Sequence, residues 1–290
     1  MLAVRDADPN VLQRSRGDGC DSVIGRKVSP LEIEEWPGRF QLIHGDAREI
    51  LPTIARGEAA MIMTDPPYGI RQNDLEGGGL ASVLERAKGI MKVPPEDRPI
   101  LNDGPEAFGL MSDLATEAAR ILLPGHVMCM CCIGGGGKSP AIIKWAEIID
   151  GTPGLIFDNL VVWDKGPMGL GWHYRRSYEF VSVALRAGAK MVWNDESHRV
   201  ENIIRPGDYG IRKIIPRANQ HPTEKPWQLG AFFIRLHSSP GDVILDPFMG
   251  SGAFGEAALR MGRRYIGIEL DDHWFESATR RLEQVAEKEQ

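Results

Sequence analysis

Cysteine is scarce in this 290-residue sequence. Only four are present, and three of them stand within four positions as Cys129, Cys131 and Cys132. So small and clustered a set does not provide a disulfide framework, and no second pair of ligands accompanies it for a structural zinc ion. We therefore expect buried, reduced thiols on a strand and no metal site.

Long apolar runs are also missing. No segment reaches the roughly 18 uninterrupted apolar residues that a membrane-spanning helix needs. The chain begins MLAVRDADPN, which is charged where a signal peptide would be apolar. We expect a cytoplasmic protein that does not act at membranes.

A general excess of positive charge is absent, because the formal net charge is -6. This excludes a uniformly basic nucleic-acid-binding protein but leaves room for a local basic region. Between Lys165 and Arg217 there are ten basic and five acidic residues, so this stretch alone carries a charge of +5. The stretch is therefore a candidate for contact with a polyanion.

From about residue 36 onward, short apolar runs alternate with segments of helical periodicity. Strands are predicted at 39–43, 60–64, 126–132, 160–163, 179–185, 243–245 and 265–269, and helices at 111–122, 139–149, 225–237, 252–261 and 272–287. Such alternation predicts an α/β fold, with a mainly parallel sheet covered by helices on both faces. Residues 1–35 lack sustained periodicity, so we expect them to form an arm before a single domain of residues 36–290.

A glycine-rich loop, DPFMGSGAFG, follows the predicted strand at 243–245. Gly250, Gly252 and Gly255 satisfy the GxGxxG spacing, and Glu269 ends the next predicted strand, where a carboxylate can bind a ribose. The glycines alone fit a nicotinamide-dependent oxidoreductase equally well, so that alternative stays open.

Asp246, directly before these glycines, changes the expected ligand. A carboxylate beside a pyrophosphate would repel it. S-adenosylmethionine instead carries a sulfonium and an ammonium and no phosphate, so Asp246 can attract its cationic part while Glu269 binds its ribose. We expect S-adenosylmethionine as the cofactor.

The second motif, TDPPYGI, follows the apolar run AAMIM. The Asp65 carboxylate and the Pro66 carbonyl can accept both hydrogens of an exocyclic amine on a base, which helps its lone pair localise toward a methyl group. The two prolines stiffen the turn, and Tyr68 offers a flat ring on which a flipped base can stack. The motif predicts direct methyl transfer to an amine. A carbon-5 cytosine methyltransferase would typically need a cysteine after a proline, and no cysteine here follows one.

Together these motifs resemble the amino-group DNA methyltransferases in their permuted, β-class arrangement, over roughly residues 41–282. The catalytic motif comes first, and Asp65 stands 181 positions before Asp246. The resemblance implies a circularly permuted, Rossmann-like methyltransferase fold that acts on double-stranded DNA, of the kind used in restriction–modification. By the same resemblance, aspartate at the first motif position favours adenine N6, because members that act on cytosine N4 more often carry serine there. Cytosine N4 is the main alternative, and an inactive DNA-binding module is another.

The resemblance also implies roles for individual residues. The segment LIHGDAREIL would bring Asp46 and Ala47 near the cofactor's adenine, and Lys225 of HPTEKP would line the site. The predicted cofactor-binding set is Asp46, Ala47, Lys225, Asp246, Phe248, Gly250, Ser251, Gly252 and Glu269.

Residues 187–219 would form an inserted target-recognition segment. Arginines in or near it are the predicted DNA contacts, namely Arg175, Arg176, Arg199, Arg205 and Arg212. Because this segment is short, we expect either a short recognition site or a recognised surface that the N-terminal arm or a homodimer extends.

Overall fold

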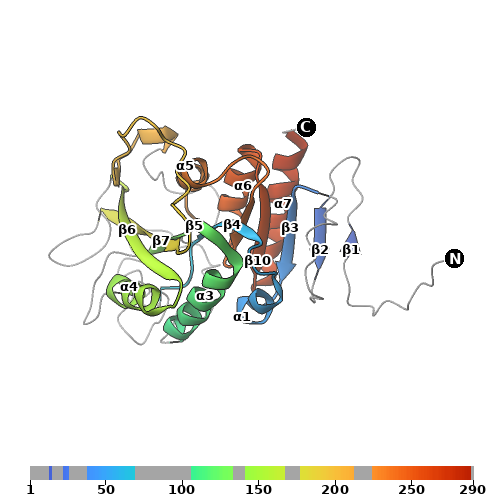
Figure 1. The fold of residues 1–290 in the computed structure, drawn as a ribbon. Coiled ribbons are helices and arrows are strands. Elements are labelled where there is room, and N and C mark those ends of the chain that lie inside the picture. Colours follow the sequence, from blue (N-terminus) through green and yellow to red (C-terminus); the bar gives the residue numbers. More distant parts are fainter. Residues whose placement is uncertain are drawn as a thin grey trace, which may run out of the picture.

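A computed structural model describes residues 13–14, 22–25, 38–68, 106–132, 141–166, 177–211 and 224–288. Their strands form one sheet in the order β1-β2-β3-β10-β9-β4-β5-β7-β6-β8, which runs across the whole molecule (Figure 1). The strands are β1 (Gln13–Arg14), β2 (Ser22–Gly25), β3 (Phe40–His44), β4 (Ala59–Thr64), β5 (Leu122–Cys132), β6 (Leu155–Asp164), β7 (Tyr178–Arg186), β8 (Ile203–Ile204), β9 (Val243–Asp246) and β10 (Arg264–Glu269).

Parallel pairing dominates the centre of the sheet. The neighbours β3, β10, β9, β4 and β5 pair in parallel, whereas β7 is antiparallel to both β5 and β6. The predicted mainly parallel α/β sheet is confirmed. Because Met61 of β4 lies opposite Ile244 of β9, the two motif-bearing strands are direct neighbours.

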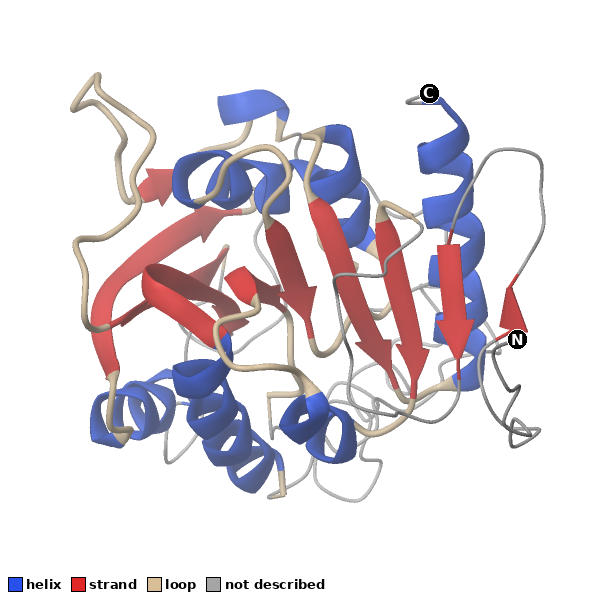
Figure 2. Ribbon diagram, turned by 45° about the vertical axis from the view of Figure 1, so that its right-hand side comes forward, coloured by secondary structure: helices blue, strands red, loops and turns tan. Residues whose placement is uncertain are grey.

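Helices cover both faces of the sheet (Figure 2). One face packs against α5 (Trp227–His237), α6 (Ala253–Arg260) and α7 (Asp272–Lys288), and the other against α1 (Ala47–Ile50), α3 (Ala107–Ile121) and α4 (Ala141–Gly151). Two 3-10 turns, η2 (Leu51–Thr53) and η3 (Asp208–Gly210), complete the described elements. Within the described ranges, no helix has the length and apolar character required to cross a membrane.

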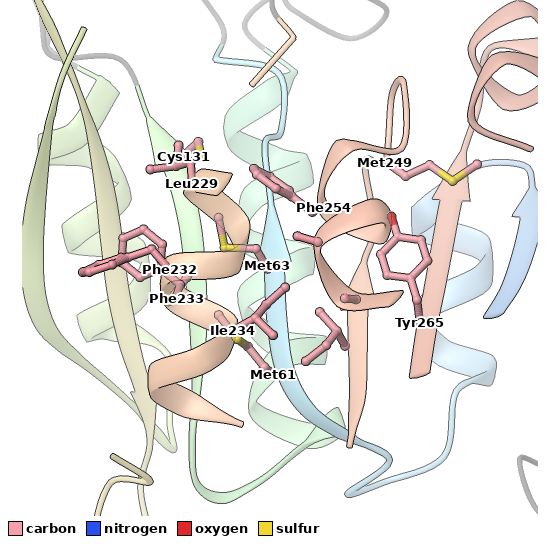
Figure 3. Close-up of a cluster of buried hydrophobic side chains, with 14 of the residues drawn as sticks. Met61, Met63, Cys131, Leu229, Phe232, Phe233, Ile234, Met249, Phe254 and Tyr265 are labelled. Atoms are coloured by element: carbon pink, nitrogen blue, oxygen red, sulfur yellow. The ribbon is translucent and has the colours of Figure 1, made fainter. Parts of the chain in front are cut away.

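Strand β4 shows how the sequence divides between two hydrophobic cores. Side chains alternate along a strand, so Met61 and Met63 face α5, where Met61 lies beside Ile234 (Figure 3). Ile62 faces the opposite core, with α1, α3 and α4. Because helices cover both faces, the strand is almost entirely apolar rather than alternating.

The clustered thiols lie on β5 as expected. Cys129, Cys131 and Cys132 are buried and free of disulfides. Burial raises the pKa of all three thiols, so they stay protonated. The prediction of buried, reduced thiols on a strand is confirmed for these three, and Cys20 lies outside the described residues.

Several strands extend beyond their predicted ends. Helix α3 stops at Ile121, and β5 begins at once with Leu122 and continues through Pro124 and Gly125. A register shift between β4 and β5 at Ala59/Met61 accommodates these residues, and Gly125 adopts a φ of 82°. Strand β6 likewise starts five residues before the predicted run at 160–163.

The N-terminal arm contributes two short strands that the sequence did not predict. Strand β2 pairs in parallel with β3, and β1 pairs antiparallel with β2, so they extend one edge of the sheet. The proposed boundary near residue 36 falls among residues outside the described ranges and remains a proposal.

Candidate active site

The carboxyl ends of three adjacent strands carry the predicted acidic residues. Asp65 follows β4, Asp246 ends β9 and Glu269 ends β10, and these strands are neighbours in the sheet. Ligands of open α/β sheets bind at this edge. The structure therefore brings both sequence motifs to one site.

Asp65 lies in a closed cluster with two other predicted residues. Lys225 Nζ is 2.7 Å from Asp65 Oδ2, and the Tyr68 hydroxyl donates to Asp65 Oδ1 at 2.5 Å. Lys225 Nζ also lies 3.1 Å from the Tyr68 oxygen and 5.5 Å from its ring centroid. Both oxygens of Asp65 are thus engaged, and Tyr68, only 6% exposed, does not present an open stacking face.

Two more residues join this cluster that sequence reasoning missed. Glu179, near the start of β7, receives Lys165 Nζ on Oε1 at 2.7 Å, and its Oε2 lies 3.3 Å from Lys225 Nζ. The strand pattern predicted Glu179 only as part of a strand. Alternation along β7 gave no reason to single it out, because its partners come from the residue after β6 and from the segment before α5.

Burial and charge act against each other in this cluster. Burial raises the pKa of Asp65, while the nearby Lys225 ammonium opposes the rise. For Glu179, burial would raise the pKa, but the two lysine ammoniums outweigh it and hold the value below normal. Burial would lower the pKa of Lys225, but the two carboxylates raise it instead, so Lys225 stays charged.

Asp246 is buried and held entirely by protein donors. Its Oδ1 accepts from the Thr64 hydroxyl at 2.7 Å and the Phe248 amide at 3.2 Å, and its Oδ2 accepts from Tyr265 at 3.1 Å. Burial raises its pKa to about 7 despite these hydrogen bonds. Asp246 therefore fixes β9 against β4 and β10, and carries a full negative charge only above neutral pH.

Glu269 closes the glycine loop. Its carboxylate accepts from the Gly250 and Asp271 amides, both at 2.8 Å, and burial raises its pKa. The loop needs glycine at Gly252, where φ is 77° and an added Cβ would lie 3.1 Å from the Cβ of Ala278. Ser251 lies between these glycines, beside Arg281.

Asp46 and Ala47 lie beside Glu269, because the Gly45 amide donates to the Glu269 carbonyl at 2.9 Å. Asp46 caps the N-terminus of α1, and hydrogen bonds from the Arg48 side chain lower its pKa. The structure thus brings this pair to the same edge as the glycine loop, with the Asp46 carboxylate already paired to Arg48.

Arg281 of α7 ties the two halves of the site together. Its guanidinium donates to Glu224 and Glu256 at 2.7 Å each, and it reaches the Ser251 carbonyl at 3.3 Å. Glu224 directly precedes Lys225 in the chain. Arg281 was not predicted as a site residue, because its position on an amphipathic helix indicates only that it lies on the solvent-facing side.

The predicted DNA contacts are only partly described. Arg175, Arg176 and Arg212 lie outside the described residues. Arg199 and Arg205 are exposed, and Arg205 pairs with Glu201 at 2.6 Å. Residues 177–211 contain four basic and five acidic side chains, so the basic excess of the wider stretch does not lie in this part.

Comparison with known proteins identifies the family. A family model described as DNA methylase, of the N6/N4 methyltransferase type, matches residues 59–280, more than half of the chain. The chain belongs to this family. It is a DNA methyltransferase of the amino-group type, as its motifs predicted, and S-adenosylmethionine is confirmed as its cofactor.

Curated relatives cover nearly the whole chain. The DNA adenine methyltransferase YhdJ of Escherichia coli (strain K12) is 24% identical over 83% of this chain and 82% of its own length. The Type II methyltransferase M.Cfr9I of Citrobacter freundii is 26% identical over 89% of this chain and 91% of its own length.

Solved structures support the same fold. M1.HpyAVI, solved as a complex with SAM, gives a TM-score of 0.56 at 24% identity and covers 84% of this chain and 99% of that one. The cytosine-N4-specific PvuII DNA methyltransferase gives a TM-score of 0.61 at 16% identity, with 87% and 93% coverage. The predicted methyltransferase fold is confirmed, and the nicotinamide-dependent oxidoreductase is set aside.

Proposed function

We propose that this DNA methyltransferase transfers the methyl group of S-adenosylmethionine to the N6 amine of adenine in double-stranded DNA, after flipping the base from the duplex. The observation that carries the proposal is the turn from Asp65 to Tyr68, which ends β4 next to the loops of β9 and β10. Aspartate at its first position supports adenine.

The loop after β9 fits the expected cofactor. The positive φ angles of Gly250 and Gly252 turn the backbone tightly, and the partly buried Glu269 carboxylate holds the loop while keeping lone pairs for ribose hydroxyls. Asp246, behind this loop, supplies negative charge toward the sulfonium side. The bound cofactor supplies an electrophilic methyl group.

Asp65 and the Pro66 carbonyl then accept the two hydrogens of the target amine. The amine gains positive charge as its lone pair attacks, and a carboxylate aligned beforehand stabilises that charge. In the structure both Asp65 oxygens are engaged by Lys225 and Tyr68. For the full Asp65 charge to act on the amine, the Lys225 contact has to open, and the Tyr68 ring becomes available for stacking once its hydroxyl leaves Asp65.

Cytosine N4 is the second candidate for the accepting amine. The same two acceptors can engage the N4 hydrogens of cytosine, and the structurally similar PvuII enzyme is cytosine-N4-specific. A smaller ring would have to reach the same acceptors. The two acceptors alone do not distinguish the bases, and the preference for adenine rests on aspartate as the first residue of the motif.

The deciding experiment is a product analysis. Purified protein is incubated with unmethylated DNA from several sources and S-adenosylmethionine, and the digested nucleosides are identified by mass spectrometry, with Asp65→Ala as the inactive control. We expect N6-methyladenine. N4-methylcytosine would overturn the base assignment, and no methylated base from any DNA would overturn the proposed reaction.

A variant at Tyr68 tests the stacking role. We expect Tyr68→Ala to lose most methylation while it still binds S-adenosylmethionine, because stacking concerns only the base. Calorimetric titration with the cofactor measures the second property. Full turnover in this variant would contradict the role given to Tyr68.

Phosphate contacts are assigned to the parts of the basic stretch that carry its excess charge. Residues 165–176 and 212–217 contain six basic and no acidic side chains, including Arg175, Arg176 and Arg212. Arg205 pairs with Glu201, so the neighbouring carboxylate weakens its attraction for a phosphate. Charge reversal at Arg175 and Arg176 should weaken DNA binding and reduce its salt dependence more than reversal at Arg205.

A further inference from the structure

The Lys225 ammonium lies between two partly buried carboxylates. It is 2.7 Å from Asp65 Oδ2 and 3.3 Å from Glu179 Oε2. The first distance is that of a strong charged hydrogen bond, and the second is longer than such bonds usually are. Lys225 therefore forms its stronger ion pair with Asp65, and Glu179 lies close by as a second carboxylate partner.

One carboxylate oxygen of Glu179 can still accept a hydrogen bond from this ammonium. Its Oε1 is held by Lys165 at 2.7 Å, whereas its Oε2 is buried and makes no hydrogen bond among the described residues. Lys165 thus fixes the carboxylate and keeps its second oxygen directed at Lys225. A buried oxygen that accepts no hydrogen bond costs folding free energy, so its presence in a native structure calls for an explanation.

The reaction needs Asp65 without its lysine. An ammonium at 2.7 Å offsets the negative charge of Asp65 and opposes the positive charge that develops on the attacking amine. Lys225 is only 6% exposed and stays charged, so it cannot simply be released without another buried counter-ion. Glu179 is the described carboxylate within reach.

We propose that Glu179 is a positioning residue that takes over the Lys225 ammonium when the target base engages Asp65. This inference rests on the proposed function, because the base amine is what displaces Lys225. Only the ion pair changes. Nζ moves from Asp65 Oδ2 toward Glu179 Oε2, no proton is transferred, and the net charge of the cluster is unchanged.

The first test measures stability and does not depend on activity. Urea unfolding gives the free energies of unfolding of Glu179→Gln, Lys225→Met and their double variant, and these yield the coupling energy between residues 179 and 225. The cycle is measured twice, once in wild-type protein and once in Asp65→Asn. With Asp65 neutral, Lys225 should shift to Glu179, so the coupling should grow by about tenfold in the unfolding equilibrium constant. An unchanged coupling would overturn the proposal.

The second test measures turnover. We expect Glu179→Gln to lower kcat at least about tenfold with little change in cofactor affinity, because Lys225 then stays on Asp65. Glu179→Asp should recover part of the loss, and Glu179→Gln should cost little further activity in a Lys225→Met background. Additive losses would show that Glu179 does not act through Lys225.

A matched control separates this effect from general loss of an ion pair. Glu117 on α3 is a partly buried carboxylate that pairs with Arg120 at 2.6 Å, away from the site. Glu117→Gln should leave kcat unchanged. If the wild-type protein methylates no DNA, the proposed function fails, whereas the stability test still decides whether Glu179 is the alternative counter-ion.

Discussion

Replacing Asp246 by asparagine should make the protein more stable at alkaline pH. Asparagine keeps the shape of the side chain, and its oxygen can still accept from Thr64 and Phe248. Its amide group can donate to the Tyr265 hydroxyl, which accepts as well as donates. The variant therefore keeps the three contacts of this carboxyl group and removes its titration.

The magnitude follows from the pKa of Asp246, which burial raises from 3.8 to about 7. The folded protein holds this proton more tightly than the unfolded chain, so the stability from this group is full below the unfolded pKa and is lost as pH rises through the folded one. At pH 8 the loss approaches about 4 kcal/mol, of which about 2 to 3 kcal/mol arises between pH 5 and pH 8.

Urea unfolding at pH 5 and pH 8 measures this difference. The stability of Asp246→Asn relative to wild type should increase by about 2 to 3 kcal/mol from the lower to the higher pH. Asp150→Asn, at an exposed position of α4, is the matched control and should show no comparable change. An equal difference at both pH values would refute the idea that Asp246 is protonated near neutrality.

Three further predictions concern the cofactor site. Binding of the cationic cofactor at pH 7 should release up to about half a proton from wild type, because Asp246 is then about half protonated, and none from Asp246→Asn. Calorimetry in buffers of different ionisation enthalpy measures the release, and equal release from both proteins would remove Asp246 as its source. Gly252→Ala should cost at least about 1 to 2 kcal/mol in urea unfolding, because φ is 77° and the new Cβ meets Ala278. Arg281→Met should weaken cofactor binding about tenfold in a calorimetric titration, because Glu224 and the Ser251 backbone lose their common partner. Unchanged affinity would show that Arg281 only stabilises the fold.

The sequence predicted the sheet well where local pattern and tertiary structure agree. Strand β4 is apolar because both of its faces are covered, and the glycine loop is recognisable because Gly252 has to adopt a positive φ. Strand ends were less predictable. Proline and glycine normally end an element, yet Pro124 and Gly125 lie inside β5, since a register shift against β4 admits them.

The polar contacts of the site could be predicted only in part. Asp65, Asp246 and Glu269 follow from their positions at strand ends, but the place of Glu179 depends on the pairing of β7 with β6, which no local pattern specifies. Arg281 depends likewise on how α7 packs against α6. When the partner of a polar residue lies on a distant element, the periodicity of the residue's own segment does not indicate the contact.

The permuted order of the motifs has a physical explanation in the sheet. Strand β3, near the start of the described domain, pairs directly with β10, near its end, with Phe40 opposite Tyr265. Because β3 and β10 are adjacent, a connection between them and an opening elsewhere in the chain would leave the pairing of the central strands unchanged. The contact between β4 and β9, which unites the catalytic turn with the glycine loop, is the same in either order. The sheet, rather than the order of the chain, therefore holds the two halves of the active site together.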